Sequence, residues 1–205
     1  MESETLSPAV FGYSARREFI GTEVCQLIFG YVTLRHSIGQ MNPADRQVLA
    51  APTLYGDVLT DALLQQQTAK VEQAVGCALS PTYSYVRLHG PGATLPIHLD
   101  RPACEITVSV NIGGDAPWPL WLRTDSGDVA IDLRVGDALI YEGVVIPHWR
   151  EPFVGTRQVQ CVLHYVRRDG PFASQKFDGR PALGMPSMPP GLRDRVRAAA
   201  SRGRP

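Results

Sequence analysis

Cysteine is scarce in this 205-residue chain, and its spacing argues against two kinds of site. The four cysteines are widely scattered, and no two of them form a CxxC pair. The pattern therefore does not favour a zinc site built from cysteines or a dense framework of disulfides. We expect reduced, mostly buried thiols that act as small apolar side chains. The positions are Cys25, Cys77, Cys104 and Cys161.

A surplus of charge and a long apolar run are lacking as well. Twenty basic residues balance twenty acidic ones, so no positive excess favours nucleic acid or an anionic membrane as a partner. No apolar run reaches the length of a membrane span, and residues 1–4 show neither the basic nor the apolar region of a signal peptide. We expect a globular, cytoplasmic protein without nucleic-acid or membrane partners. Its oligomeric state is left open, a homodimer included.

The first third of the chain has helical periodicity. Apolar residues recur at helical spacing after Thr22, which is a suitable N-cap. A second apolar stripe runs from about 54 to 75, and Gly76 is placed to end it. The sequence therefore predicts two helices before the chain changes character at Pro81.

After Pro81 the apolar period becomes that of β-strands. Glycine-containing turns separate several short alternating segments, as in antiparallel sandwiches and barrels. Between 104 and 112, apolar side chains fall on one face and polar ones, such as Thr107 and Ser109, on the other. The predicted strands are 82–89, 104–112, 120–124, 128–133, 137–143 and 157–168. We predict a mainly β fold with flanking helices that cover one sheet.

These patterns suggest one domain over residues 1–169, with a helical part at 14–78 and a strand core at 82–169. Residues 170–205 differ, because they are rich in proline, glycine and arginine. This composition predicts disorder by default. A lid or a partner-binding arm is left open.

Two of the five histidines stand in a suggestive relation to one aspartate. His98 precedes Asp100 by two residues, and His148 follows about fifty residues later. Two imidazoles and one carboxylate can occupy one face of an iron(II) ion and leave the remaining positions for other ligands. The HxD pattern alone is short and common. The prediction of a metal site therefore depends on the distant His148 and on the strands between it and the HxD segment.

Residues 82 to about 170 resemble the iron(II)- and 2-oxoglutarate-dependent dioxygenases, on the prolyl-hydroxylase-like side of that superfamily. The segments that carry the resemblance are YSYVRLHGPGATLPIHLDR, GDALIYEG and PHWREPFVGTRQVQCVLHY. It implies a double-stranded β-helix, or jelly roll, buttressed by the N-terminal helices. It also implies that His98, Asp100 and His148 bind Fe(II), that 2-oxoglutarate is the cosubstrate and that O2 is consumed.

The resemblance further implies a basic residue that binds the far carboxylate of 2-oxoglutarate. Arg157 follows His148 by nine positions and heads the last predicted strand, so we expect its side chain to point inward. Arg101 and Arg150 are alternatives for this role. Tyr85, on the preceding strand, is a candidate hydrogen-bond donor to the cosubstrate.

By this resemblance the chain would oxidise, most simply hydroxylate, an unactivated carbon of a small molecule such as an amino acid or a natural-product intermediate. A protein or peptide hydroxylase is an alternative. So is a jelly-roll protein that binds a ligand without catalysis, and so is a zinc or manganese isomerase or hydrolase that needs no 2-oxoglutarate.

Overall fold

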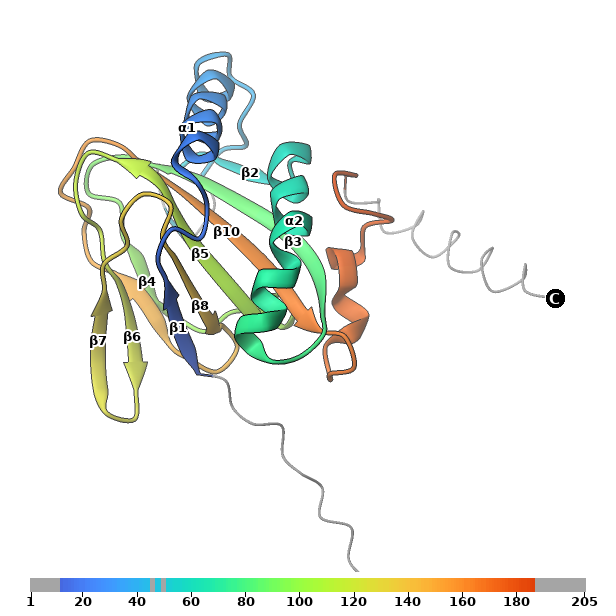
Figure 1. The fold of residues 1–205 in the computed structure, drawn as a ribbon. Helices are drawn as coiled ribbons and strands as arrows, with labels where there is room; N and C mark the ends of the chain where they lie inside the picture. The colour runs from blue at the N-terminus through green and yellow to red at the C-terminus, as the bar shows by residue number, and fades with distance from the viewer. Residues whose placement is uncertain (1–11, 45–46, 49–50, 187–205) are drawn as a thin grey trace, which may run out of the picture.

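The structure is a computed structural model, and it describes residues 12–44, 47–48 and 51–186. It is mainly β, with two antiparallel sheets and two long helices (Figure 1). The six-stranded sheet has the order β1 (Tyr13–Arg16), β8 (Ala138–Glu142), β5 (Ile106–Gly114), β10 (Gln158–Arg167), β3 (Leu79–His89) and β2 (Thr53–Tyr55). The four-stranded sheet has the order β4 (Leu95–His98), β9 (His148–Arg150), β6 (Leu120–Thr124) and β7 (Gly127–Ile131).

The helices are α1 (Thr22–Ser37) and α2 (Val58–Val75), as the periodicity predicts, but α2 begins later than expected. Gly56 has a φ of +57°, and the side chain of Asp57 accepts a hydrogen bond from the backbone N–H of Leu59. This cap starts the helix after Gly56, so the preceding residues are free to join β2. Gly76 ends α2 in the left-handed conformation at a φ of 80°, as predicted.

The long strands lie within two or three residues of their predicted bounds, whereas four short strands were not predicted. These are β1, β2, β4 and β9, each with three or four residues. So few residues show no measurable alternation. Two of these strands, β4 and β9, matter most, because they pair with each other at His98 and His148.

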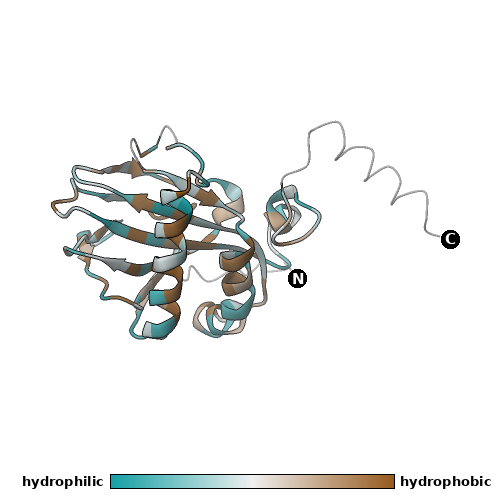
Figure 2. Ribbon diagram, turned by 90° about the horizontal axis from the view of Figure 1, so that it is seen from above, coloured by the Kyte–Doolittle hydropathy of each residue, from teal (hydrophilic) through white to brown (hydrophobic). Residues whose placement is uncertain are grey.

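Both faces of the six-stranded sheet are buried, and they differ in chemistry. The outer face forms one hydrophobic core with the helices: Ile28 of α1 and Leu64 of α2 pack in the same cluster as Val108 and Cys161. Along the strands, brown hydrophobic and teal hydrophilic residues alternate (Figure 2). The inner face is the polar one, and it faces the four-stranded sheet across a cavity.

Residues 170–186 pack against the body of the protein, which corrects the expectation of disorder for this part of the predicted tail. The turn η2 (Ala173–Gly179) lies against β3, and the side chain of Arg180 is fully buried. Its guanidinium forms an ion pair of 2.7 Å with Asp61 of α2 and donates a hydrogen bond to the carbonyl of Thr82. The division at residue 169 and the lid function remain predictions, and the rest of the tail lies outside the described residues.

All four cysteines are free thiols, and three of them are buried, as expected. Within the described part of the chain, no helix is both long enough and apolar enough to span a membrane.

Candidate metal centre

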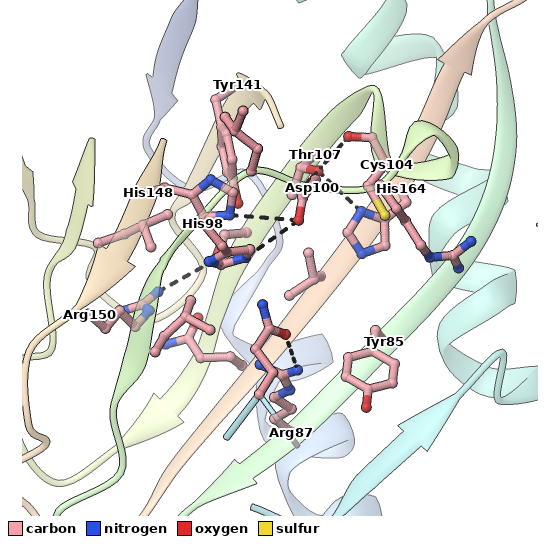
Figure 3. Close-up of a pocket in the computed structure, with 18 of the residues that line it drawn as sticks. Tyr85, Arg87, His98, Asp100, Cys104, Thr107, Tyr141, His148, Arg150 and His164 are labelled. Atoms are coloured by element: carbon pink, nitrogen blue, oxygen red, sulfur yellow. Dashed lines mark hydrogen bonds and ion pairs between the residues drawn. The ribbon is translucent and has the colours of Figure 1, made fainter. Parts of the chain in front are cut away.

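A cavity of about 430 Å³ opens between the two sheets. The six-stranded sheet contributes inward side chains from β3, β5, β8 and β10, and the four-stranded sheet contributes them from β4, β6 and β9. Figure 3 shows the polar residues that gather at this place. His98, Asp100, His148, Tyr85, Arg101 and Arg150 all line the cavity, whereas Arg157 does not.

The three predicted metal ligands converge on one point. The Nε2 atoms of His98 and His148 lie 3.6 and 3.7 Å from Oδ1 of Asp100. All three side chains offer a ligand atom within 4.8 Å of the others (Figure 3). Two nitrogen donors and one carboxylate oxygen on one side of a common point match the facial set of non-haem iron(II) sites.

The two imidazoles are held in the orientation that such a site requires. Nδ1 of His98 lies 2.8 Å from the carbonyl of Pro96, and Nδ1 of His148 lies 2.9 Å from the carbonyl of Ile146. A carbonyl can only accept, so each Nδ1 carries a proton, and in the neutral form of each ring Nε2 has the lone pair that a metal needs, directed at Asp100. Burial lowers the pKa of His148, which favours the neutral, metal-binding form.

Asp100 is kept ionised within this buried group. Burial raises its pKa, but the interaction with His98, the nearby imidazoles and the hydroxyl of Thr107 outweigh burial and lower the pKa to about 2. The backbone N–H of Asp100 donates a 2.8 Å hydrogen bond to the carbonyl of Gly143. The carboxylate is therefore charged and fixed before any metal binds.

The HxD segment does not lie within one strand. His98 is the last residue of β4, and Asp100 lies in the loop that leads to the turn η1 (Pro102–Cys104). The strand β5 that follows belongs to the opposite sheet. The HxD segment therefore crosses from one sheet to the other, and this crossing puts Asp100 between them.

Asp100, Cys104 and His164 form a second group whose ligand atoms lie within 4.8 Å of one another. Burial raises the pKa of the Cys104 thiol to about 12 and lowers the pKa of His164 to about 4. The thiol is therefore protonated, and it lies 3.0 Å from the hydroxyl of Tyr83. Since the thiolate is the form that binds metal, hydrogen bonding explains this group better than a second ion does.

Arg157 does not point into the cavity, which corrects the inward orientation predicted for it. It precedes β10 and is exposed, and its backbone N–H donates to the carboxylate of Asp115. The side chains that alternate with it, such as Val159 and Cys161, pack towards the helices. The cavity receives the other face of β10, on which Gln160 and His164 lie.

Arg150 is the buried arginine beside the predicted ligands. It lies two residues after His148 on β9, and only 5% of its surface is exposed. It donates to the carbonyl of Trp118, and its Nη2 lies 3.5 Å from Oγ of Ser109. In the part of the chain that the structure describes, no carboxylate forms an ion pair with it. A buried guanidinium without a carboxylate partner is costly, so this place favours an anionic ligand.

Gln160 adds a second unsatisfied group to this end of the cavity. The side chain is 4% exposed, and its Oε1 atom has no hydrogen-bond partner among the described residues. An amide can be turned to present either its oxygen or its NH2 group, so it can donate to an anion as well as accept. Ser109, Arg150 and Gln160 together offer donors from three strands.

The other two predicted cosubstrate residues lie in the cavity wall. Tyr85 is half-buried on β3 and packs under the guanidinium of Arg87 at 5.0 Å. Arg101 forms a two-pronged ion pair with Asp178 of η2, at 2.7 and 2.6 Å. Arg101 thus joins the C-terminal segment to the loop that carries Asp100. Cosubstrate contacts for both residues remain predictions.

The sequence did not single out several residues that the cavity contains. Arg87, Gln160 and His164 lie on its wall. The sequence feature that could have identified them is the period of the strands, because every second residue of β3 and β10 faces inward. The period does not say which of the two faces is inward when both faces are buried.

No protein-family model matches the chain, and no curated protein matches it significantly in sequence. Solved structures do match. A prolyl-4-hydroxylase from Pseudomonas putida is 17% identical, with a TM-score of 0.65 over 77% of this chain and 93% of that one. The α-ketoglutarate-dependent epimerase SnoN from nogalamycin biosynthesis is 13% identical, with a TM-score of 0.67 over 87% and 88%. HygX from Streptomyces hygroscopicus, with nickel and 2-oxoglutarate bound, is 11% identical, with a TM-score of 0.59 over 77% and 84%.

These similarities confirm, at the level of fold, the resemblance predicted from the sequence. Each covers three quarters or more of both chains, so the similarity is not limited to a local motif. The identities are low, so the chemistry has to be argued from the residues of this chain.

Proposed function

We propose that this chain is an iron(II)- and 2-oxoglutarate-dependent oxygenase built on a double-stranded β-helix. The observation that carries the proposal is the convergence of His98 and His148, through their Nε2 atoms, on one oxygen of Asp100. Their Nδ1 protons are already bound to carbonyls, so the three donors fit a divalent metal without rearrangement. Iron and 2-oxoglutarate bound there would supply activation of O2, with release of succinate and carbon dioxide.

The remaining residues would bind the cosubstrate and keep water out. Arg150, in place of Arg157, would hold the far carboxylate of 2-oxoglutarate. It shares the inward face of β9 with His148, about 6.6 Å further along the strand. A five-carbon dicarboxylate that reaches the metal with its 2-oxo acid end can span that interval. Ser109 and Gln160 would donate further hydrogen bonds to the same carboxylate.

The test of this function is anaerobic binding followed by turnover. We expect a visible absorption band that requires iron(II) and 2-oxoglutarate together and that disappears when either one is omitted. Admission of O2 should then release succinate. A protein that binds a ligand without oxidation, or a zinc or manganese isomerase, would give neither the band nor succinate.

Replacing Arg150 tests the carboxylate anchor. Loss of one partner of a buried charge pair costs about 2–5 kcal/mol, so we expect Arg150→Met to weaken 2-oxoglutarate binding by roughly 30-fold or more. The absorption band, titrated with 2-oxoglutarate at saturating iron(II), measures this change. Arg157→Met is the matched control and should bind 2-oxoglutarate like the wild type. The reverse pattern would return the role to Arg157.

A small molecule is the substrate class that we propose, with hydroxylation as the reaction. The cavity of about 430 Å³ has to hold both cosubstrate and substrate, which favours a compact molecule such as an amino acid or a natural-product intermediate. The structures with similar folds include HygX with hygromycin B bound and a Trichoplax adhaerens prolyl hydroxylase with a peptide bound. Succinate release across amino acids, antibiotic intermediates and proline-containing peptides separates these classes.

A further inference from the structure

A row of four side chains crosses the inner face of the six-stranded sheet at the level of Asp100. The strand register pairs Tyr83 with His164, His164 with Thr107, and Thr107 with Tyr141. All four line the cavity. Tyr141 packs edge-on against the imidazole of His148 at 4.8 Å, whereas Thr107 contacts Asp100. The row therefore supports two of the three metal ligands from behind.

Thr107 makes its shortest contact with the aspartate. Its hydroxyl donates a 2.7 Å hydrogen bond to Oδ2 of Asp100, the oxygen that does not face the two histidines. Nδ1 of His164 lies 3.2 Å from the same hydroxyl, and the carbonyl of Cys104 lies 3.1 Å away. The hydroxyl has one proton, so donation to Asp100 leaves its lone pairs to accept from the His164 N–H.

Gly143 leaves the room that this arrangement needs. A Cβ atom at this position would lie 2.2 Å from Oδ2 of Asp100 and 2.8 Å from Oγ1 of Thr107. The glycine is the residue whose carbonyl accepts the hydrogen bond from the backbone N–H of Asp100. The main chain of Gly143 thus holds the aspartate backbone while its missing side chain admits the carboxylate.

We propose that Thr107 and His164 are positioning residues that fix Asp100 as a ligand through Oδ1 alone. The inference rests on the proposed function, because it concerns the same three ligands. Binding Oδ2 from behind prevents the carboxylate from turning to offer both oxygens to a metal, and it keeps that face free for other ligands. Contacts that orient a metal ligand typically change metal affinity by 10- to 100-fold when they are removed.

The test is metal binding by the whole chain without O2 or 2-oxoglutarate, with Co²⁺ as the probe. Thr107→Val should weaken Co²⁺ binding by roughly 10- to 100-fold and alter the Co²⁺ absorption spectrum. Thr107→Ser keeps the hydroxyl, so its affinity and spectrum should stay close to those of the wild type. His164→Phe should weaken binding less than Thr107→Val does, since Thr107 can still donate to Asp100.

Thr82→Val is the matched control for folding. Thr82 is equally buried and donates a 2.7 Å hydrogen bond to the carbonyl of Ala103, but it does not line the cavity. Thr82→Val should bind Co²⁺ like the wild type even if it unfolds at a lower temperature.

Wild-type Co²⁺ affinity and an unchanged Co²⁺ spectrum in Thr107→Val would overturn the inference. A His164→Phe variant with wild-type Co²⁺ affinity would show that His164 has no positioning role. If the wild type binds Co²⁺ with the predicted dependence on Thr107 but releases no succinate with any substrate, the proposed oxygenase function fails and the positioning role stands. A wild type that binds no divalent metal contradicts both.

Discussion

His148→Ala is expected to abolish succinate release from 2-oxoglutarate and to remove tight iron(II) binding. His148 supplies one of only two nitrogen donors, and its Nε2 lies 3.7 Å from the carboxylate that completes the set. Removing a residue behind a ligand already costs 10- to 100-fold in affinity or activity, so loss of the ligand itself should exceed about 100-fold. Succinate release and iron(II) binding by the same preparation measure the two effects.

Two further histidine variants test whether this loss is specific to the predicted metal ligands. His98→Ala should behave like His148→Ala, because the two imidazoles are equivalent in their contacts with Asp100. His36→Ala, at the exposed end of α1, should retain wild-type turnover. Full activity in either ligand variant would rule out the proposed iron site.

Asp61→Asn is expected to destabilise the fold by about 3–5 kcal/mol, because it leaves the buried charge of Arg180 without its partner. Asp61 is 1% exposed, and its carboxylate accepts hydrogen bonds from Ser84, Arg180 and Gly184. The free energy of unfolding in urea measures the loss. The double variant Asp61→Leu with Arg180→Met should recover part of it, since a buried pair can be replaced by apolar residues.

The exposed pair of Arg123 and Asp128 provides the matched control. Its nitrogen and oxygen atoms are 2.9 Å apart, but the two side chains are 55% and 40% exposed. Asp128→Asn should leave the free energy of unfolding close to that of the wild type, because water screens such pairs. An Asp61→Asn variant as stable as Asp128→Asn would show that the buried pair does not hold the C-terminal segment in place.

The grouping of His98, Asp100 and His148 and the long strands could be predicted from the sequence. The HxD segment lies within three residues, and strands such as β5 and β10 are long enough to show alternation. His98 lies beside His148 because β4 and β9 pair with each other within the four-stranded sheet. The strands that carry the histidines, β4 and β9, are too short to give a signal of their own.

Arg157 shows where such a prediction fails. In a strand with two buried faces, alternation gives two sets of residues but does not say which set faces the cavity. A shift by one residue exchanges the two faces. Arg157 and Val159 belong to the set that faces the helices, so the predicted anchor lies outside, and Arg150 on an unpredicted strand lies inside.

Contacts between distant segments also escaped prediction. Arg180 and Asp61 are 119 positions apart, and Asp178 is 77 positions from Arg101. Composition placed residues 170–186 in a disordered tail, because proline, glycine and arginine seldom form a core. One buried ion pair and the hydrogen bonds around it are enough to reverse that expectation.

The ion pair of Asp61 and Arg180 has a consequence for the order in which the protein matures. During synthesis the chain emerges from the ribosome from its N-terminus, so Asp61 and the three predicted metal ligands are translated before Arg180. Until then Asp61 lacks its counter-charge, and Arg101, next to the predicted ligand Asp100, lacks its ion pair with Asp178. The wall beside the predicted metal centre is therefore completed only after Asp178 and Arg180 have been synthesised.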